Sequence, residues 1–191
     1  MSRDETSLVR LRQGLDAAFG AARVGVVLVR KGEAVLSVRP QRDARHRLQM
    51  TVRPGELVPI DGALRRVVEV HHAGGPDLLP GASPDYVVID SKPVAAGSVT
   101  LHADSLAIPL GATANAAGYD LEVVSLGADA TAGLEIWPDE FAKPQTRPEL
   151  IKSFAVKNGA RIAAGARQLS IISVVPPNAS SGLRGFVEVG W

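Results

Sequence analysis

Residues 54–70 read PGELVPIDGALRRVVEV, and this stretch is the clearest indication of the fold class. Two segments rich in β-branched residues, Glu56–Ile60 and Leu64–Val70, flank the pair Asp61-Gly62. Asp-Gly between two such segments is a strong signal for a two-residue β-hairpin turn. Pro54-Gly55 marks a further turn just before the first segment. The sequence therefore predicts an antiparallel hairpin here.

Further strand patterns precede and follow this hairpin. Val24–Arg30 and Glu33–Arg39 are β-branched runs joined by Lys31-Gly32, which predicts a second hairpin. His46–Val52 alternates apolar and polar residues, as a half-buried strand does. Tyr86–Asp90 is a further short strand.

The second half of the chain also consists of short apolar segments separated by turn residues. The predicted strands are Ser98–Ala103, Ser105–Leu110, Tyr119–Leu126, Gly133–Trp137, Ser153–Lys157, Gln168–Val175 and Gly185–Trp191. The alternation of strands with long helices that marks a parallel α/β sheet is missing. The fold class is therefore mainly β: an antiparallel β-sandwich or barrel, either jelly-roll-like or an SH3-like barrel plus a sandwich.

One helix is expected at the N-terminus. Leu8, Leu11, Leu15 and Phe19 fall at helical spacing, and Gly20 is placed to end the helix. This stripe would need a partner, either the body of the protein or another subunit. The loop of residues 91–97 suggests a boundary between a region 1–92, with the helix and a small barrel, and a sandwich region 93–191. One continuous domain is the alternative.

Composition excludes several classes of protein. The chain of 191 residues contains no cysteine, which excludes disulfides, zinc–thiolate sites and a cysteine nucleophile. The net charge of +1 argues against a dedicated nucleic-acid binder. Apolar runs are far shorter than the roughly 20 residues of a membrane helix, and the charged N-terminal segment is unlike a secretory signal. We expect no membrane insertion, and a location in the cytoplasm or in a virion or other assembly built there.

Sequence motifs for catalysis are absent. There is no G-x-S-x-G nucleophile elbow and no phosphate-binding G-x-x-x-x-G-K-[ST] loop. His71, His102 and Asp104 could form the metal site of a cupin-like enzyme only if the fold brought them together. Tyr119 and Trp137 could line a pocket for a sugar or small ligand. The main prediction is a non-enzymatic protein without a cofactor or metal, and these two readings are the alternatives.

Basic residues concentrate between Arg39 and Arg53, where Asp43 is the only acidic residue. Arginine pairs well with carboxylates and phosphates because its planar guanidinium can donate two parallel hydrogen bonds. This segment could therefore contact an acidic protein surface, although a solubilising surface would have the same composition. The hairpin of residues 54–70 also resembles one of a small SH3-like barrel, a pattern shared by translation, secretion and phage-tail proteins. That resemblance covers less than a tenth of the chain and implies no site residues.

The function expected from these observations is structural. We predict a subunit of a β-rich virion (a bacteriophage capsid, neck or tail) or of a secretion apparatus, acting through protein–protein contacts as a homo-oligomer or with other subunits. The C-terminal strand, ending on Trp191, is expected to be packed in the sheet or against a partner. The candidate interface residues are Leu8, Leu11, Leu15, Phe19, Arg42, Arg45, Arg47, Trp137, Phe141 and Trp191.

Overall fold

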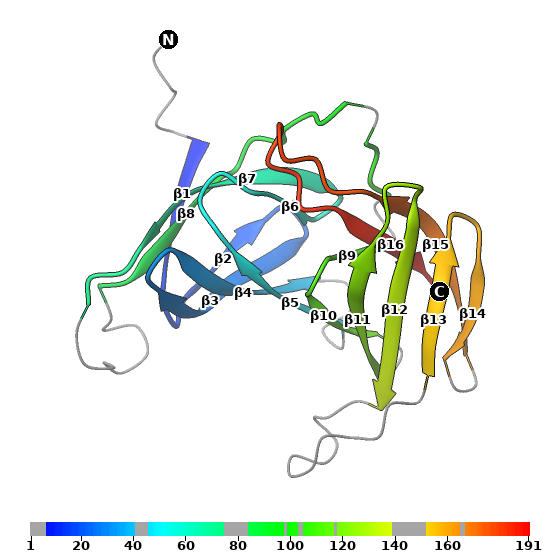
Figure 1. Ribbon diagram of the computed structural model, residues 1–191. Coiled ribbons are helices and arrows are strands. Elements are labelled where there is room, and N and C mark those ends of the chain that lie inside the picture. Colours follow the sequence, from blue (N-terminus) through cyan, green and yellow to red (C-terminus); the bar gives the residue numbers. More distant parts are fainter. Residues whose placement is uncertain are drawn as a thin grey trace.

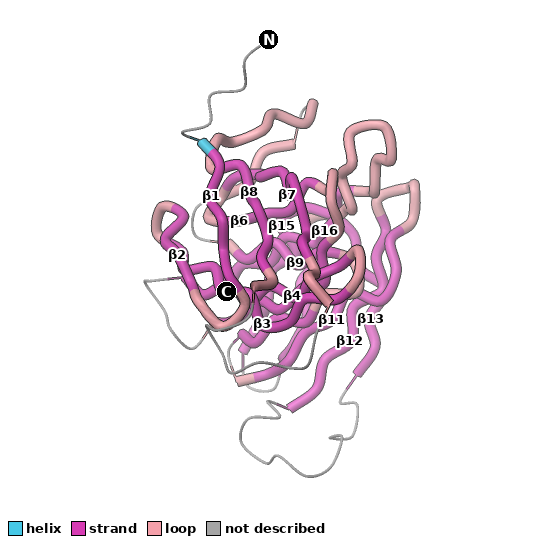
Figure 2. The backbone as a smooth tube through the Cα atoms, turned by 90° about the vertical axis from the view of Figure 1, so that its left-hand side faces the viewer, coloured by secondary structure: helices cyan, strands magenta, loops and turns pink. Residues whose placement is uncertain are grey.

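The computed structural model describes residues 7–40, 46–74, 84–97, 99–102, 105–116, 118–138, 152–164 and 167–191. Strands make up most of this backbone (Figure 2). Their bounds are β1 Leu8–Arg12, β2 Asp16–Phe19, β3 Ala22–Arg30, β4 Glu33–Pro40, β5 Arg47–Val52, β6 Leu57–Ile60, β7 Ala63–His71, β8 Tyr86–Asp90, β9 Leu106–Pro109, β10 Thr113–Ala116, β11 Tyr119–Leu126, β12 Thr131–Pro138, β13 Lys152–Lys157, β14 Arg161–Ala164, β15 Arg167–Val175 and β16 Phe186–Gly190. Among the described residues there is no helix long and apolar enough to cross a membrane.

The strands form one large sheet and two small ones. The large sheet has the order β13-β12-β11-β10-β5-β4-β3-β2, and the small sheets have the orders β1-β8-β7-β6 and β14-β15-β16-β9. All neighbouring strands within these sheets pair antiparallel. In Figure 1 the large sheet runs from β2–β5 on one side of the molecule to β10–β13 on the other. The fold is therefore mainly β, antiparallel and sandwich-like.

One apolar core includes residues from all three sheets. Strands β1 and β8 of the first small sheet contact β3, and β15 and β16 of the second contact β13 and β11. Leu36, Leu121 and Leu169, one from each of three strands in this core, are fully buried. Both halves of the chain thus contribute to the same sheet and to the same core. The division into regions 1–92 and 93–191 stays a prediction.

The hairpin predicted from residues 54–70 is confirmed as β6 and β7. Ile60 pairs with Ala63 across the turn, and both central residues have positive φ, 52° at Asp61 and 67° at Gly62, as a type I′ turn requires. Asp61 also accepts a hydrogen bond from the Ala21 backbone N–H at 2.8 Å. The turn of this hairpin is therefore tied to the turn between β2 and β3.

The prediction of an N-terminal helix is wrong. Residues 8–12 form β1, which pairs with β8, and residues 16–19 form β2, which pairs with β3. Leu11 and Phe19 are buried in the core, whereas Leu15 lies in the connection and is 52% exposed. A spacing of three to four residues fits a helix, but two short strands joined by a turn produce the same spacing. The pairing partner of β1 lies far along the chain, where a local pattern cannot reveal it.

Most other predicted strands are confirmed within one or two residues of their predicted ends. The exception is Ser98–Ala103, because residues 99–102 are described and form no strand. Besides β1 and β2, two strands were not predicted, β10 with the sequence TANA and β14 with the sequence RIAA. Alanine has a low β-propensity, so these segments have no strand signal of their own. The C-terminal strand β16 is packed as expected, between β15 and β9.

Candidate functional site

The side of the large sheet opposite the core, here called the outer face, carries most of its polar residues. Pairing aligns one row across all eight strands: Asp16, Gly25, Ser37, Gln49, Thr113, Glu122, Glu135 and Ser153. Because side chains alternate along a strand, the residues on either side of this row point into the core. Leu36 and Leu121, for example, are fully buried. The outer face thus carries a row of mostly polar residues across all eight strands.

One end of the outer face is basic. Arg23 pairs with Arg39 between β3 and β4, so their side chains lie on the same face. Val38 pairs with Leu48, so the next residues, Arg39 and Arg47, project from the outer face as well. Arginines on adjacent strands repel one another unless acidic groups compensate. Arg23 is compensated by Asp16, with nitrogen–oxygen distances of 2.5 and 3.0 Å.

The contact with Arg23 changes the pKa of the Asp16 carboxylate. The hydrogen bond from Arg23 lowers the pKa of Asp16 below its ordinary value, and the charges of Arg23 and Arg39 lower it further, against a smaller effect of burial. Both partners are solvent-exposed, so the contribution of the pair to stability is small. Its effect is to orient the Arg23 guanidinium at the border of the basic end.

The other end of the outer face is acidic. Asp120 and Glu122 on β11 and Glu135 on β12 all project from it, and Glu122 pairs with Glu135. Asp120 is buried and accepts a hydrogen bond from the Asn115 side chain at 3.1 Å. Glu122 and Glu135 are half-buried. Their adjacent carboxylates form an acidic patch.

Arg39 and Glu122, toward opposite ends of the outer face, lie too far apart along the sheet to pair with each other in one molecule. Three strand spacings separate Arg39 on β4 from Glu122 on β11, a distance of about 14 Å. At physiological ionic strength, interactions between exposed charges are largely screened beyond about 8 Å. These two charges are therefore not joined to each other across the sheet.

A groove with a volume of about 530 Å³ lies within the basic end. This groove, called the groove below, is lined by residues of β2–β5 and of the turn before β2: Gly14, Leu15, Asp16, Gly25, Val26, Val27, Ser37, Arg39, Arg47 and Gln49. Leu15 and Val27 are two of the few large apolar side chains that are more than 40% exposed, at 52% and 49%. Apolar residues beside arginines are typical of protein-binding surfaces.

A second cluster of polar residues surrounds the buried carboxylate of Glu188. Its oxygens accept hydrogen bonds from the His102 backbone N–H at 2.7 Å, from the Ser173 hydroxyl at 2.9 Å and from the Ser105 hydroxyl. His102 Nδ1 lies 3.0 Å from Glu188 Oε1. Burial raises the pKa of Glu188, but the hydrogen bonds together lower it more, so the carboxylate stays ionised in the core.

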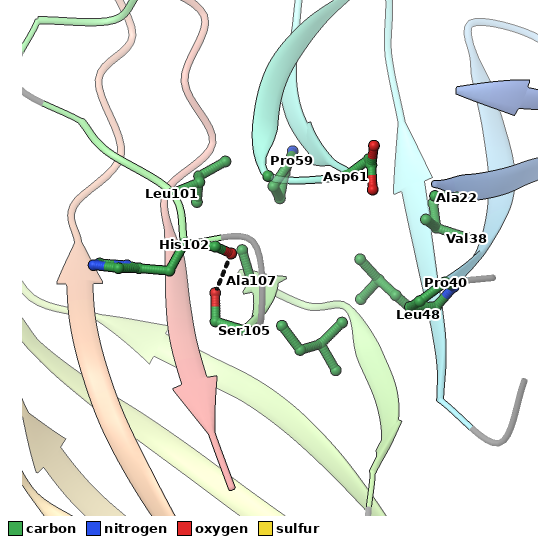
Figure 3. A pocket seen from close by; sticks show the side chains of 12 residues that line it. Ala22, Val38, Pro40, Leu48, Pro59, Asp61, Leu101, His102, Ser105 and Ala107 are labelled. Carbon is green, nitrogen blue, oxygen red and sulfur yellow. Dashed lines mark hydrogen bonds between the residues drawn. The ribbon is translucent and has the colours of Figure 1, made fainter. Parts of the chain in front are cut away.

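A small pocket beside this cluster is lined by His102, Ser105 and residues of β6, β5 and β4 (Figure 3). Its volume is about 80 Å³, well below the roughly 300 Å³ at which small-molecule sites begin. The His102 ring points away from it, and the Ser105 hydroxyl lies 2.8 Å from the His102 carbonyl oxygen. The cluster therefore anchors the segment before β9 to β16, and nothing about the pocket favours a substrate.

The structure gives the residues of the metal-site alternative different partners. His71 stacks on Tyr86, with ring centroids 4.6 Å apart, whereas His102 contacts Glu188. Asp104 lies outside the described residues. Within the part of the chain that the structure describes, no three His, Asp or Glu side chains gather as metal ligands.

The aromatic pair suggested for a small-ligand site is split between two faces. Tyr119 pairs with Pro138 and packs against the core, whereas Trp137 pairs with Asp120, the next residue along, and lies on the outer face. Trp137 is itself buried. The two rings therefore do not line one pocket.

The interface residues expected from the sequence have different environments. Leu11, Phe19 and Trp137 are buried within the chain, Leu8 is half-buried, and Leu15 and Trp191 are about half exposed. Trp191 packs on the buried His46, with ring centroids 4.3 Å apart. Arg42, Arg45 and Phe141 lie outside the described residues. Leu15 and Arg47 both line the groove.

The sequence predicted Arg39 and Arg47 in the basic segment and Gln49 on the polar side of its strand, but it did not indicate Ser37, Glu122 or Glu135 as members of this face. The missed residues are polar positions in strands that alternate. Alternation predicts which side of its own strand a residue lies on, but not which strands pair beside it. Their alignment depends on the β5–β10 pairing, which joins distant parts of the chain.

Comparison with known proteins gives one match. Residues 6–83 match the model of a family of unknown function (DUF6406). No curated protein and no solved structure matches the chain. The matched segment, less than half of the chain, includes every residue that lines the groove.

Proposed function

We propose that the protein is a non-enzymatic assembly subunit that associates with a second copy through the outer face of its large sheet. The observation that carries this proposal is the separation of charge on that face, with arginines on β3–β5 and carboxylates on β11 and β12. Arg39 on β4 and Glu122 on β11 lie three strands apart, too far to pair with each other within one molecule.

A two-fold axis would resolve this separation. In an isologous dimer the same surface contacts itself in reverse, so the basic end of each copy meets the acidic end of the other. Arg39 of one copy would then face Glu122 of the other, twice per dimer. Leu15 and Val27 beside the groove add apolar area that such a contact would cover.

Assembly subunits of this kind suit a virion or a secretion apparatus, and we propose that class for this protein. Support comes from the sandwich-like architecture and from the absence of catalytic motifs in the sequence. The outer face, with arginines at one end, carboxylates at the other and the groove, also supports it. The SH3-like reading of the first half is part of the same proposal.

The test is native mass by light scattering over a range of protein concentrations at low and high salt. We expect dimers that dissociate more readily as salt rises, because the contact is electrostatic. Arg39→Glu alone and Glu122→Lys alone should each raise the dimer dissociation constant at least tenfold, because each puts like charges opposite one another.

The decisive measurement is light scattering on a mixture of Arg39→Glu and Glu122→Lys. One of the two contacts in a mixed dimer then pairs a Glu at position 39 with a Lys at position 122, so the mixture should associate more tightly than either variant alone. Arg30→Glu is the matched control, since Arg30 is an exposed arginine of β3 that does not line the groove. A monomer at all concentrations, or equal effects of Arg30→Glu and Arg39→Glu, would overturn the proposal.

A further inference from the structure

We propose that copies of this chain join head to tail through the two ends of the large sheet, with β13 of one copy pairing with β2 of the next. The inference goes beyond the proposed function, because it uses the edges of this sheet and not its outer face. It rests on an internal repeat, in which the pairing of β5 with β10 inside the chain is the template for the pairing between copies.

The chain consists of two units of eight strands, and both units have the same strand order. In the first unit, β2-β3-β4-β5 form half of the large sheet and β1-β8-β7-β6 form a small sheet. In the second unit, β10-β11-β12-β13 form the other half of the large sheet and β9-β16-β15-β14 form the other small sheet (Figure 1). Each strand of the first unit therefore corresponds to the strand eight places later.

The pairing register of the two units also agrees. Asp16 pairs with Gly25 between β2 and β3, and Thr113 pairs with Glu122 between the corresponding strands β10 and β11. Every other ladder within the first unit has a counterpart in the second, and the paired residues correspond one by one over their shared length. Agreement over all ladders indicates one eight-stranded arrangement used twice.

The irregular features of the backbone repeat as well. β3 and β11 each have a β-bulge opposite the next strand, and β7 and β15 each have one opposite β8 and β16. The Gly14 N–H donates to the Val26 carbonyl at 2.8 Å, and the Gly111 N–H donates to the Val123 carbonyl at 2.7 Å. Bulges are specific features of a fold, so their presence at corresponding places identifies the repeated unit.

The two units meet in a joint between different edges. β5 of the first unit pairs antiparallel with β10 of the second, with Gln49 opposite Thr113 and Leu48 opposite Ala114. β10 corresponds to β2 of the first unit, and β5 corresponds to β13 of the second. The joint therefore shows that an edge of the β13 type and an edge of the β2 type fit each other.

One edge of each type remains at the ends of the large sheet. Among the strands that the structure describes, β2 pairs only with β3 and β13 pairs only with β12. An edge strand presents backbone N–H and C=O groups to a further strand, although lysines such as Lys152 and Lys157 of β13 disfavour unspecific pairing. The correspondence with the internal joint, and not exposure alone, thus identifies the partner of β13 as β2 of another copy.

The internal joint also predicts the register between copies. Gln49 corresponds to Ser153, and Thr113 corresponds to Asp16, so Ser153 of one copy is expected opposite Asp16 of the next. The row of residues across the outer face begins with Asp16 and ends with Ser153, so it would continue from copy to copy. Because the two edges differ, the contact is heterologous, and repeated contacts close into a ring or extend into a filament.

The test is disulfide crosslinking, because the chain contains no cysteine of its own. The variant Asp16→Cys/Ser153→Cys places one cysteine on each edge. Seven strand spacings, about 34 Å along the sheet, separate the two positions within one chain, so a disulfide between them must join two copies. Asp16→Cys/Ala155→Cys is the matched control, since Ala155 is an exposed residue of β13 two residues out of register.

Both variants are oxidised at high salt, where the electrostatic contact of the outer face is weakened. We expect Asp16→Cys/Ser153→Cys to give a ladder of covalent dimers, trimers and larger species on non-reducing gels, and reduction should return them to monomers. The control should crosslink at least fivefold more slowly, because its two positions lie diagonally across the strands. Each single variant should stop at the dimer, since it has one cysteine.

Ala17→Cys/Lys152→Cys, the neighbouring pair in the same register, is the second variant, and circular dichroism shows which variants are folded. A ladder that ends at one size indicates a ring, and a ladder without an end indicates a filament; both support head-to-tail pairing. Monomers only in folded in-register variants, or equal rates in register and out of register, would overturn the inference. Disulfides that join position 16 to position 16 and position 153 to position 153 would overturn it as well.

Discussion

The His102 backbone N–H and the Glu188 carboxylate, 86 residues apart in sequence, form a 2.7 Å hydrogen bond in the interior of the protein. Glu188 is fully buried, and two serine hydroxyls complete its set of donors. A buried carboxylate is tolerated only when its charge is satisfied in this way. The contact connects the segment before β9 to the strand that β9 pairs with.

Acid should weaken the protein through Glu188. Its pKa lies below the ordinary value of 4.5, so the folded state favours the ionised form. The resulting stability is fully present above pH 4.5 and is lost as the pH falls through the lower, folded-state pKa. Glu188→Gln should reduce the free energy of unfolding at pH 7 by about 2 kcal/mol, because hydrogen bonds to a charged group are lost.

Urea denaturation of both proteins between pH 7 and pH 3 checks this prediction. The difference between wild type and Glu188→Gln should shrink as the pH falls, because protonation removes the same charge from the wild type. A difference that stays constant over this range would contradict the assigned role of the charge. Glu69→Gln, at an exposed position, is the control and should show little effect at any pH.

The turn at Asp61 should respond to the identity of its side chain. Asp61 has a φ of 52° and accepts a hydrogen bond from Ala21. Asp61→Ala should destabilise by about 1–2 kcal/mol, because it removes the acceptor and puts alanine in a left-handed conformation. Asp61→Asn retains an acceptor and suits that conformation, so thermal unfolding should place it close to the wild type. Equal losses in both variants would show that only the charge matters.

The N-terminal segment gives a prediction that separates strand from helix. Leu11 is 2% exposed in β1, and Leu15 is 52% exposed beside the groove. Leu11→Glu buries an unpaired charge and should cost more than about 4 kcal/mol, leaving little folded protein. Leu15→Glu should fold, with a change within about 0.5 kcal/mol, but should self-associate less. Circular dichroism and light scattering would show both effects, and a well-folded Leu11→Glu protein would contradict the structure.

The shared sheet predicts that the two halves unfold together. Leu36 on β4 and Leu121 on β11 are both fully buried in the same core. Leu36→Ala and Leu121→Ala should each cost about 2–5 kcal/mol and should each lower one common transition. Calorimetry with hydrogen exchange on β3 and β12 measures this. Two separate transitions, each sensitive to one variant, would favour the boundary near residue 92.

Local signals were sufficient for the hairpins. Asp61-Gly62 and Lys31-Gly32 fix turns by their own chemistry, and the flanking strands alternate or are β-branched, so the sequence predicted β3, β4, β6 and β7. Leu8–Phe19 was misread because its apolar spacing suits a helix, while the strand that pairs with β1 lies about 80 residues away. Short alanine-rich strands such as β10 form because of their neighbours, which no local pattern contains.

The candidate site was only partly predictable for the same reason. The basic segment was visible as composition, and Arg47 and Leu15 were named as interface residues. The acidic end, the burial of Ser37 and the role of Glu188 depend on which strands become neighbours. A glutamate in an alternating strand predicts a solvent-facing side chain, and Glu188 is buried only because Ser105, Ser173 and His102 surround it.

The position of β16 near the end of the chain also matters during synthesis on the ribosome. Strand β9 pairs with β16 within its sheet, and the Ser105 hydroxyl donates to the Glu188 carboxylate, which is synthesised 83 residues later. At about 5–20 residues per second, the nascent chain carries an unpaired β9 for roughly 4–16 seconds. During this interval neighbouring chains on one messenger could pair with the open edge. Polysome spacing and chaperone access are therefore expected to influence the yield of folded protein.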